Sequence, residues 1–188
     1  MHRKLRSILG FALLSSSVCL TACNRIKASS HVAFMGDSLT EGWSLPRVNL
    51  GRHGQTTTQM LQRFQDGILR NNVRTVVILG GTNDVLNGVD KATTISNLGR
   101  MADIAEQNGI RPVLCKIPPI YAQQGKFAPQ VEQLNKEIAS LAATKNLKLV
   151  DFYTPLQGHP SYFGDGIHMG NRGYLIMDWT LEKQVSLF

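Results

Sequence analysis

The sequence predicts a single three-layer α/β domain built on a parallel sheet of about five strands. Three observations point to this fold class: short apolar runs alternate with segments of helical periodicity, Gly, Pro or Asn bound the runs, and no repeat or internal linker interrupts the alternation. Runs that are apolar throughout are typical of strands buried on both faces, as in a parallel sheet. Right-handed crossovers between such strands place helices on both faces of the sheet.

The predicted strands and helices follow one another in order along the chain. Strands are expected over Val32–Met35, Val48–Leu50, Thr75–Leu79, Val113–Ile117 and Leu147–Phe152. Apolar spacings of three and four predict helices over 60–69, 95–105, 131–141 and, to close the domain, Tyr174–Val185. Only twelve residues, 37–48, join the first two strands, and Pro46 interrupts them, so at most a turn or two of helix fits there.

The first 22 residues are typical of a signal peptide. A basic start precedes an apolar stretch, 8–18, which is too short to span a bilayer, and Leu20-Thr21-Ala22-Cys23 closes the segment. This ending resembles the bacterial lipobox, in which the peptide is cut before a cysteine that then carries the lipid. We therefore expect a signal peptide over 1–22, a lipidated Cys23 with a short linker to residue 30, and one domain over 31–188. An ordinary cleavable signal is the alternative, and both interpretations export the domain.

Charge and cysteine content limit the classes of partner. Removal of Arg3, Lys4 and Arg6 with the signal lowers the net charge from +7 to +4, and no Lys/Arg run follows, so no nucleic-acid partner is expected. A membrane is the expected partner through Cys23, and the oligomeric state is left open. Besides Cys23 the mature chain keeps only Cys115, so no disulfide can form within the domain, and its apolar surroundings predict a core residue.

Small and polar residues follow three of the predicted strands directly. Gly36-Asp37-Ser38 follows the first strand, Gly54 lies just after the second, and Gly81-Thr82-Asn83-Asp84 follows the third. In an open parallel sheet, ligands bind beyond the carboxyl ends of the strands. We therefore expect the three segments to converge on one edge of the sheet.

Two of the motifs suggest a nucleophile and its base. Ser38 lies on a tight strand-to-helix turn, although Thr40 stands where the Gly-x-Ser-x-Gly motif has its second glycine. Asp165-Gly166-Ile167-His168 is the only Asp-x-x-His in the chain. On a turn this spacing can bring the carboxylate to Nδ1 of the imidazole and leave Nε2 for a serine. The structural alternatives are a helix N-cap serine and an aspartate that caps the last helix beside an incidental histidine.

Acyl transfer also requires donors for a developing oxyanion. Gly54 can present its backbone N–H at close range, because it has no side chain, and Asn83 can offer its amide. The alternative interpretation makes both of them ordinary turn residues.

The order of these motifs, Gly36-Asp37-Ser38-Leu39, Gly54, Gly81-Thr82-Asn83-Asp84 and Asp165-x-x-His168, resembles the SGNH (GDSL-type) hydrolases. The resemblance runs from about His31 to Trp179. It implies a flavodoxin-like sheet and a carboxylic ester hydrolase that works through an acyl-enzyme without a cofactor or metal. It also implies roles for individual residues: Ser38 as nucleophile, His168 as base, Asp165 as the group that orients it, and an oxyanion hole formed by Ser38, Gly54 and Asn83.

The sequence departs from the family pattern at two places. Met169 follows the histidine, where proline is frequent, and the segment after the nucleophile is short. The short segment favours acetyl or other short-chain esters of a saccharide. A lysophospholipase or thioesterase for longer chains is the alternative. Aromatic residues of the predicted loops are candidates for stacking on sugar or lining an acyl groove: Trp43, Tyr121, Tyr153, Tyr162 and Phe163.

Two interpretations from other functional classes have less support in the sequence. A zinc site would draw on Asp165 and on His31, His53, His159 and His168, but the chain has no His-Glu-x-x-His motif and no paired cysteines, and His31 begins a strand at the opposite edge of the sheet. A surface module that only binds glycans or lipids would be expected to have lost its motifs, whereas all four are intact.

Overall fold

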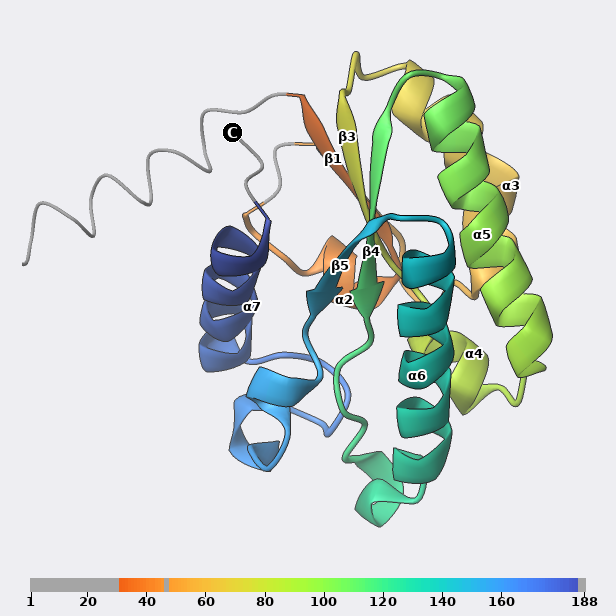
Figure 1. The fold of residues 1–188 in the computed structure, drawn as a ribbon. Coiled ribbons are helices and arrows are strands. Elements are labelled where there is room, and N and C mark those ends of the chain that lie inside the picture. The colour runs from red at the N-terminus through yellow and green to blue at the C-terminus, as the bar shows by residue number, and fades with distance from the viewer. Residues whose placement is uncertain (1–30, 46–47, 186–188) are drawn as a thin grey trace, which may run out of the picture.

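The computed structural model describes residues 31–45 and 48–185. The predicted signal peptide, Cys23 and the linker to residue 30 lie outside this part of the chain. Figure 1 shows a central sheet between two layers of helices, as the sequence predicts. The sheet has five strands in the order β2-β1-β3-β4-β5, and every neighbouring pair is parallel.

The strands lie where the apolar runs predict them, with small shifts at their ends. Their bounds are β1 Val32–Gly36, β2 Val48–Gly51, β3 Thr75–Leu79, β4 Arg111–Lys116 and β5 Lys148–Asp151. The largest shift is in β4, which begins two residues before the predicted Val113 and includes Pro112. Proline lacks an N–H, but the pairing of β4 with β5 starts only at Val113, so no ladder hydrogen bond is lost on that side.

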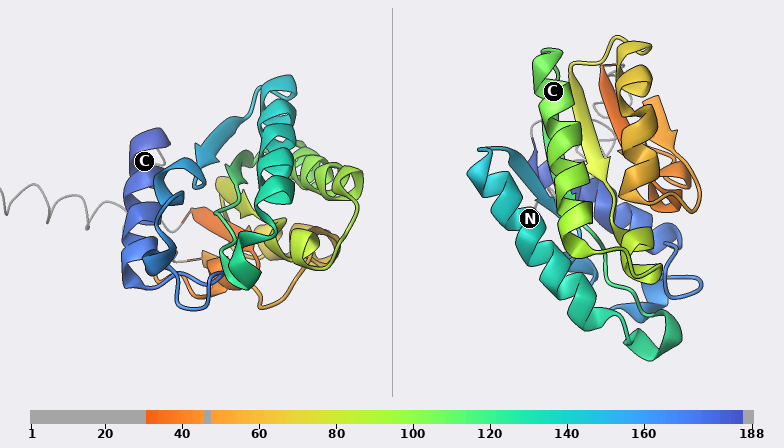
Figure 2. Two further views of the ribbon diagram at one scale, coloured as in Figure 1. Left: turned by 90° about the horizontal axis from the view of Figure 1, so that it is seen from below. Right: turned by 90° about the vertical axis from the view of Figure 1, so that its right-hand side faces the viewer.

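The long helices cover the two faces of the sheet unequally. Three of them, α3 (Thr57–Leu69), α5 (Lys91–Gln107) and α6 (Ala128–Thr144), pack on one face, whereas α7 (Asn171–Gln184) and the four-residue α2 (Ser38–Glu41) lie on the other (Figures 1 and 2). The short α2 fits the twelve-residue limit that the sequence sets on this crossover.

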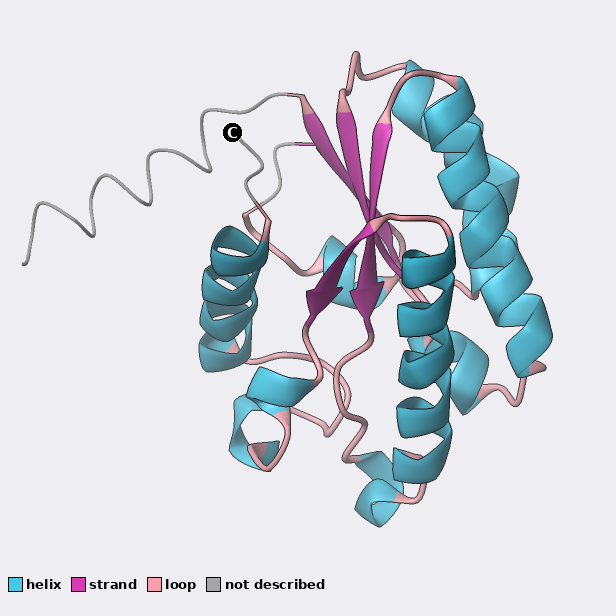
Figure 3. Ribbon diagram, viewed as in Figure 1, coloured by secondary structure: helices cyan, strands magenta, loops and turns pink. Residues whose placement is uncertain are grey.

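Two helices differ from the prediction. Helix α7 begins at Asn171, three residues before the predicted start. Its first turn was not predicted because it contains Gly173, and glycine is a poor helix former. A Cβ on Gly173 would lie 2.9 Å from the carbonyl oxygen of Tyr162, so the close packing there requires glycine. The five-residue α4 (Thr82–Leu86) was not predicted, since it is too short to show a period; Figure 3 shows it among the loops at the carboxyl edge of the sheet.

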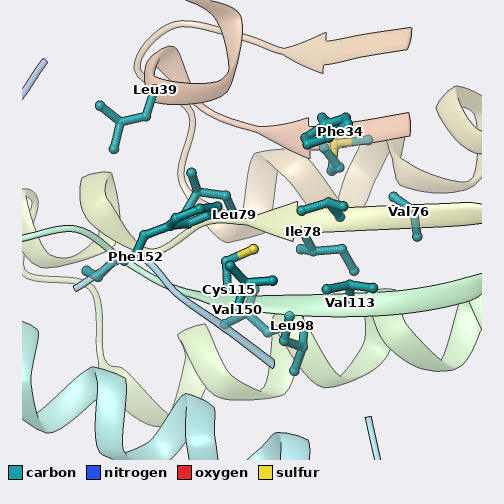
Figure 4. Packing of buried hydrophobic residues seen from close by; sticks show 14 of the residues in the cluster. Phe34, Leu39, Val76, Ile78, Leu79, Leu98, Val113, Cys115, Val150 and Phe152 are labelled. Carbon is teal, nitrogen blue, oxygen red and sulfur yellow. The ribbon is translucent and has the colours of Figure 1, made fainter. Parts of the chain in front are cut away.

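The core is formed by apolar side chains of the strands and of the helices that cover them. Figure 4 shows this packing for the labelled residues, among them Val113 and Cys115. Cys115 is 2% exposed, which confirms it as a core residue. No helix in the described ranges is both long and apolar enough to cross a bilayer.

Trp43, one of the candidates for stacking on sugar or lining an acyl groove, is a packing residue instead. Its side chain is 2% exposed and packs edge-on against Phe34 and Phe152, with ring centroids 5.1 and 5.7 Å away. Its Nε1–H donates to Asp178 Oδ1 at 2.5 Å, so it anchors the connection after α2 to α7. Phe163 is also buried, edge-on to Tyr121. Large aromatic surface in short loops is buried when a neighbouring helix supplies an apolar face, and the sequence does not show which helix will do so.

Candidate active site

Ser38 is the first residue of α2 and follows β1 after a single intervening residue. Asp37 is the N-cap of α2, because its Oδ1 accepts the Leu39 N–H at 2.9 Å. Ser38 is therefore not the capping residue, and its hydroxyl is free for another partner. A Cβ on Gly36 would overlap the hydroxyl of Thr40 and lie 2.7 Å from the Leu79 carbonyl oxygen, so only glycine permits this tight turn.

The structure brings Ser38, His168 and Asp165 together in one hydrogen-bonded line. Ser38 Oγ lies 2.9 Å from His168 Nε2, although 130 residues separate the two along the chain. On the other side of the ring, His168 Nδ1 lies 2.6 Å from Asp165 Oδ2. Both distances are within the range expected of a serine, a base and the group that orients the base.

The loop that carries Asp165 and His168 is closed on itself. The Gly164 N–H donates to the His168 carbonyl oxygen at 2.9 Å, and Asp165 Oδ1 accepts the backbone N–H groups of Ile167 and His168 at 2.9 and 2.7 Å. The N-cap of α7 is Gly170, so Asp165 does not cap that helix. These bonds fix the carboxylate relative to the imidazole before any substrate binds.

A second segment supports this loop from outside. The carbonyl oxygen of Gly166 accepts the N–H groups of Tyr121 at 2.7 Å and Ala122 at 3.1 Å. Gly166 has a φ of +84°, and a Cβ there would lie 2.6 Å from the Ala122 nitrogen. Glycine is therefore required for the loop to dock against this segment.

Asp165 is held in its ionised form. Partial burial raises the pKa of its carboxyl, but the hydrogen bonds from the His168 side chain and from the His168 and Ile167 N–H groups outweigh this effect and lower the pKa to about 2. An ionised carboxylate can only accept, so neutral His168 carries its proton on Nδ1 and turns the Nε2 lone pair to Ser38. The Asp165 and His168 side chains are 56% and 40% exposed, which makes the site open.

The two candidate oxyanion donors also lie side by side. Gly54 has a φ of +70° with no atom within 4 Å of a Cβ position, so its backbone is open to a ligand. Asn83, in the first turn of α4, donates one amide N–H to the carbonyl oxygen of Gln55 at 3.0 Å. This bond joins the loop after β2 to the loop after β3, and it leaves the second amide N–H of Asn83 available.

A buried polar cluster behind these donors was not predicted. Asp84 Oδ2 accepts the Thr57 N–H at 2.9 Å, and its Oδ1 accepts the hydroxyls of Thr57 at 2.6 Å and Thr94 at 3.1 Å. Because Thr57 is the first residue of α3, the carboxylate also stabilises the start of that helix. Asp84 belongs to a motif that the sequence analysis singled out, but its partners on α3 and α5 have no signal in the sequence.

The ring of His53 lies next to the imidazole of His168, offset from it and nearly parallel to it. Their ring centroids are 5.9 Å apart and the planes are inclined by 16°. The sequence suggested His53 only as a zinc ligand, together with His31, which instead lies 3.1 Å from the Asn72 carbonyl oxygen at the opposite edge of the sheet. Within residues 31–45 and 48–185, no three His, Cys, Asp or Glu side chains are grouped as metal ligands, so no cluster there supports a zinc site.

A comparison with protein families decides which family the chain represents. The model of the GDSL-like lipase/acylhydrolase family matches residues 34–176, a span that contains all four motifs. The chain belongs to this family. Membership confirms the resemblance seen in the sequence and implies hydrolase activity. A search of curated proteins gave no match.

Solved structures of other GDSL-type proteins share the fold. A putative acylhydrolase from Bacteroides fragilis is 26% identical with a TM-score of 0.75, covering 94% of this chain and 97% of that one. A GDSL-like lipase from Bacteroides thetaiotaomicron is 26% identical with a TM-score of 0.74, covering 87% and 95%. An acetyl-xylooligosaccharide esterase from Geobacillus shows the same fold at 16% identity and a TM-score of 0.72, covering 84% and 94%. The predicted fold class is confirmed.

The aspartate of this GDSL-type motif is in an unfavourable environment. Asp37 is fully buried, and its Oδ2 has no hydrogen-bond partner among the described residues. Burial raises the pKa of its carboxyl from 3.8 to about 7, against the opposing effect of the Leu39 hydrogen bond, and nearby Asp84 raises it further. Burial therefore favours the neutral form of the carboxyl that caps α2.

This burial predicts a specific pH dependence of stability. Below about pH 4 the Asp37 carboxyl is protonated in both the folded and the unfolded chain. As the pH rises from about 4 to about 7, the carboxyl ionises in the unfolded chain but stays protonated in the folded one. The free energy of unfolding therefore falls over this range, by at most about 4 kcal/mol. Asp37→Asn keeps an oxygen for the Leu39 N–H but cannot ionise. In urea unfolding followed by circular dichroism, the stability of this variant relative to wild type should rise between pH 4.5 and 8. A difference that stays constant over this range would contradict the assignment.

Proposed function

We propose that the protein is a serine esterase that cleaves acyl esters with Ser38 as nucleophile, His168 as base and Asp165 as the group that orients it. One observation carries the proposal: the unbroken line of hydrogen bonds from Asp165 Oδ2 through both ring nitrogens of His168 to Ser38 Oγ. Membership of the acylhydrolase family supports the same chemistry.

The geometry supports a two-stage mechanism. His168 Nε2 takes the proton of Ser38 as Oγ attacks the acyl carbon, and then gives it to the departing alcohol, which leaves an acyl-enzyme. Asp165 stabilises the imidazolium formed in between. The oxyanion accepts hydrogen bonds from the N–H groups of Ser38 and Gly54 and from the amide of Asn83. The Ser38 N–H is available because it lies at a helix start, where it has no intrahelical acceptor. Water then repeats the sequence with the acyl-enzyme and releases the acid.

Short acyl groups, above all the acetyl group, are the proposed substrates, carried on a saccharide. The four-residue α2 builds no helical wall beside Ser38, and the exposed Asp165 and His168 leave the site open. A long acyl chain gains about 0.8 kcal/mol for each methylene only where protein buries it. Two solved structures with this fold are an acetyl xylan esterase and an acetyl-xylooligosaccharide esterase, which supports the proposal of an acetylated saccharide.

The aromatic candidates for sugar stacking are fewer than the sequence suggested. Trp43 and Phe163 are buried, and Tyr121 donates its hydroxyl to the Leu156 carbonyl oxygen at 3.0 Å. The ring of Tyr162 lies parallel to that of exposed His159, with centroids 4.7 Å apart. This last pair is the best remaining platform for a sugar ring.

We further propose that a lipid attached to Cys23 anchors the protein to a membrane. The support is the sequence Leu20-Thr21-Ala22-Cys23 after a basic start and a short apolar run. The acyl chains would hold the exported domain at the membrane, with the domain facing the periplasm or the cell surface.

The nucleophile assignment is tested by covalent labelling. A fluorophosphonate probe should label the wild-type protein and Ser44→Ala, an exposed serine six residues away, but not Ser38→Ala. Because the three residues act as one unit, Ser38→Ala/His168→Ala should hydrolyse p-nitrophenyl acetate about as slowly as either single variant. Labelling of Ser38→Ala, or losses that multiply in the double variant, would refute the assignment.

The acyl preference is tested with p-nitrophenyl esters from acetyl to dodecanoyl. We expect kcat/KM to be highest for acetyl and to fall or stay level as the chain grows, because no buried trough rewards added methylenes. A several-fold rise for each pair of methylenes beyond butyryl would show that the site binds alkyl chains, and the function would then be that of a lysophospholipase or thioesterase.

The anchor is tested by cell fractionation of the full chain. Cys23→Ser should move the protein from the membrane to the soluble fraction or block its processing. Cys19→Ser, which changes a residue expected to leave with the signal, should fractionate like wild type. Membrane retention of a Cys23→Ser protein that is cleaved to the same length as wild type would remove the support for a lipid anchor.

A further inference from the structure

A groove of about 320 Å³ runs along the outer edge of the sheet, between β2 and α3. Its lining includes the three arginines Arg52, Arg63 and Arg70 and only one acidic residue, Asp66. Like charges in a concave surface repel one another, and a cleft lined mainly by one sign of charge raises the local concentration of ligands of the opposite sign.

The three arginines differ in how their charges are balanced. Arg70 Nη2 lies 3.2 Å from Asp66 Oδ2, so these two charges form a pair. Neither Arg52 nor Arg63 takes part in an ion pair within the described part of the chain. The groove therefore holds two guanidinium groups that form no ion pair with a described carboxylate.

Arg63 is held in place by neutral oxygens. Its Nε donates to Gln55 Oε1 at 2.6 Å, and its two terminal nitrogens donate to the carbonyl oxygens of Leu50 at 2.7 Å and Gly36 at 3.0 Å. Three of its five N–H groups are used in this way, which leaves two for a ligand. Burial, and secondly the charge of Arg52, lowers the pKa of Arg63 to about 10, so the two guanidinium groups are close enough to repel. An anion between them would relieve this repulsion.

The groove is connected to the catalytic residues by three consecutive positions. The Arg52 N–H donates to the Gly36 carbonyl oxygen at 3.1 Å, two residues before Ser38. The next residue, His53, lies next to the His168 ring, and Gly54 follows. Because a chain extends by at most about 3.6 Å per residue, Arg52 lies within about 7 Å of Gly54 along the backbone.

We propose that Arg52 and Arg63 form a subsite for an anionic group of the ester substrate, a carboxylate or a phosphate borne one or two sugar rings from the acyl ester. Guanidinium groups match the oxygens of both anions with paired hydrogen bonds. The inference rests on the proposed esterase function and narrows its substrate class to acidic saccharide esters. Arg52 lines the groove and lies two residues before Gly54, so an anion bound to Arg52 would orient the saccharide along the loop that carries Gly54.

The test compares three versions of one acetylated disaccharide. The first carries a uronic acid carboxylate, the second has that carboxylate converted into the primary amide, and the third carries a phosphate monoester at the same position. Acetate release gives kcat/KM for each. For wild type we expect either anion to exceed the amide by about tenfold, mainly through KM, as for an exposed charge-assisted hydrogen bond. The larger ratio identifies the anion that the subsite fits.

Two variants separate the subsite from general charge attraction. Arg52→Gln should bring the anion-to-amide ratio close to one. Arg70→Gln removes the same charge where Asp66 already balances it, and it should keep the wild-type ratio. A wild-type ratio near one, a ratio that Arg52→Gln does not change, or an equal fall in both variants would overturn the proposal.

A binding measurement keeps this test separate from that of the esterase function. In Ser38→Ala protein, calorimetry should show the carboxylate disaccharide binding about tenfold more tightly than the amide, and Ser38→Ala/Arg52→Gln should lose the difference. Equal affinities in Ser38→Ala would refute the subsite alone. Absence of acetate release from all three versions by wild type, with the difference in binding retained in Ser38→Ala, would refute the esterase function alone.

Discussion

The close contact between the end of β1 and the start of α2 is the constraint on which the rest of the site depends. Gly36 admits no side chain because Thr40 fills the space, and a Cβ on Gly51 at the end of β2 would overlap the backbone of Glu41. Asn49 closes the other end of this short helix, since its Nδ2 donates to the carbonyl oxygens of Thr40 at 2.7 Å and Trp43 at 3.1 Å. A helix of four residues has little stability of its own, so these tertiary contacts hold the serine in position.

Two of the groups that hold the start of α2 in place are ionisable and at least partly buried, which lowers the stability of the fold. The buried carboxyl of Asp37 caps the helix that begins with Ser38, and the partly buried guanidinium of Arg63 joins the ends of β1 and β2 to Gln55. Burial disfavours the charged form of both groups, so it raises the pKa of the Asp37 carboxyl and lowers the pKa of the Arg63 guanidinium. Conflicts of this kind between local environment and charge are characteristic of functional sites, where geometry matters more than maximal stability.

The two halves of the proposed catalytic machinery are positioned in different ways. The hydrogen bonds that set Asp165 against His168 are local to their loop, and the segment at Tyr121 and Ala122 supports that loop from outside. The oxyanion side relies on contacts distant in sequence, because Asn83 reaches Gln55 and Asp84 reaches Thr57 across the sheet edge. We therefore expect the oxyanion side to be more sensitive than the Asp165 loop to changes in the packing of α3 against α5.

The sequence alone determined the layers of the fold and the residues of the candidate site. The spacing of apolar residues distinguishes strands from helices, and it located all five strands. The carboxyl ends of parallel strands share one edge of the sheet, so the segments that hold Ser38, Gly54 and Asn83 had to converge there. Only the tertiary structure decided that Trp43 is buried, that Asp84 holds the start of α3, that His53 lies next to His168, and that Arg52 and Arg63 share a groove. These contacts join side chains far apart in sequence, and no local period or motif encodes which element will lie opposite another. The sequence also did not predict α4, because a helix of five residues is too short to show a hydrophobic period. It did not predict the first turn of α7, because Gly173 has low helix propensity and is required there by close packing.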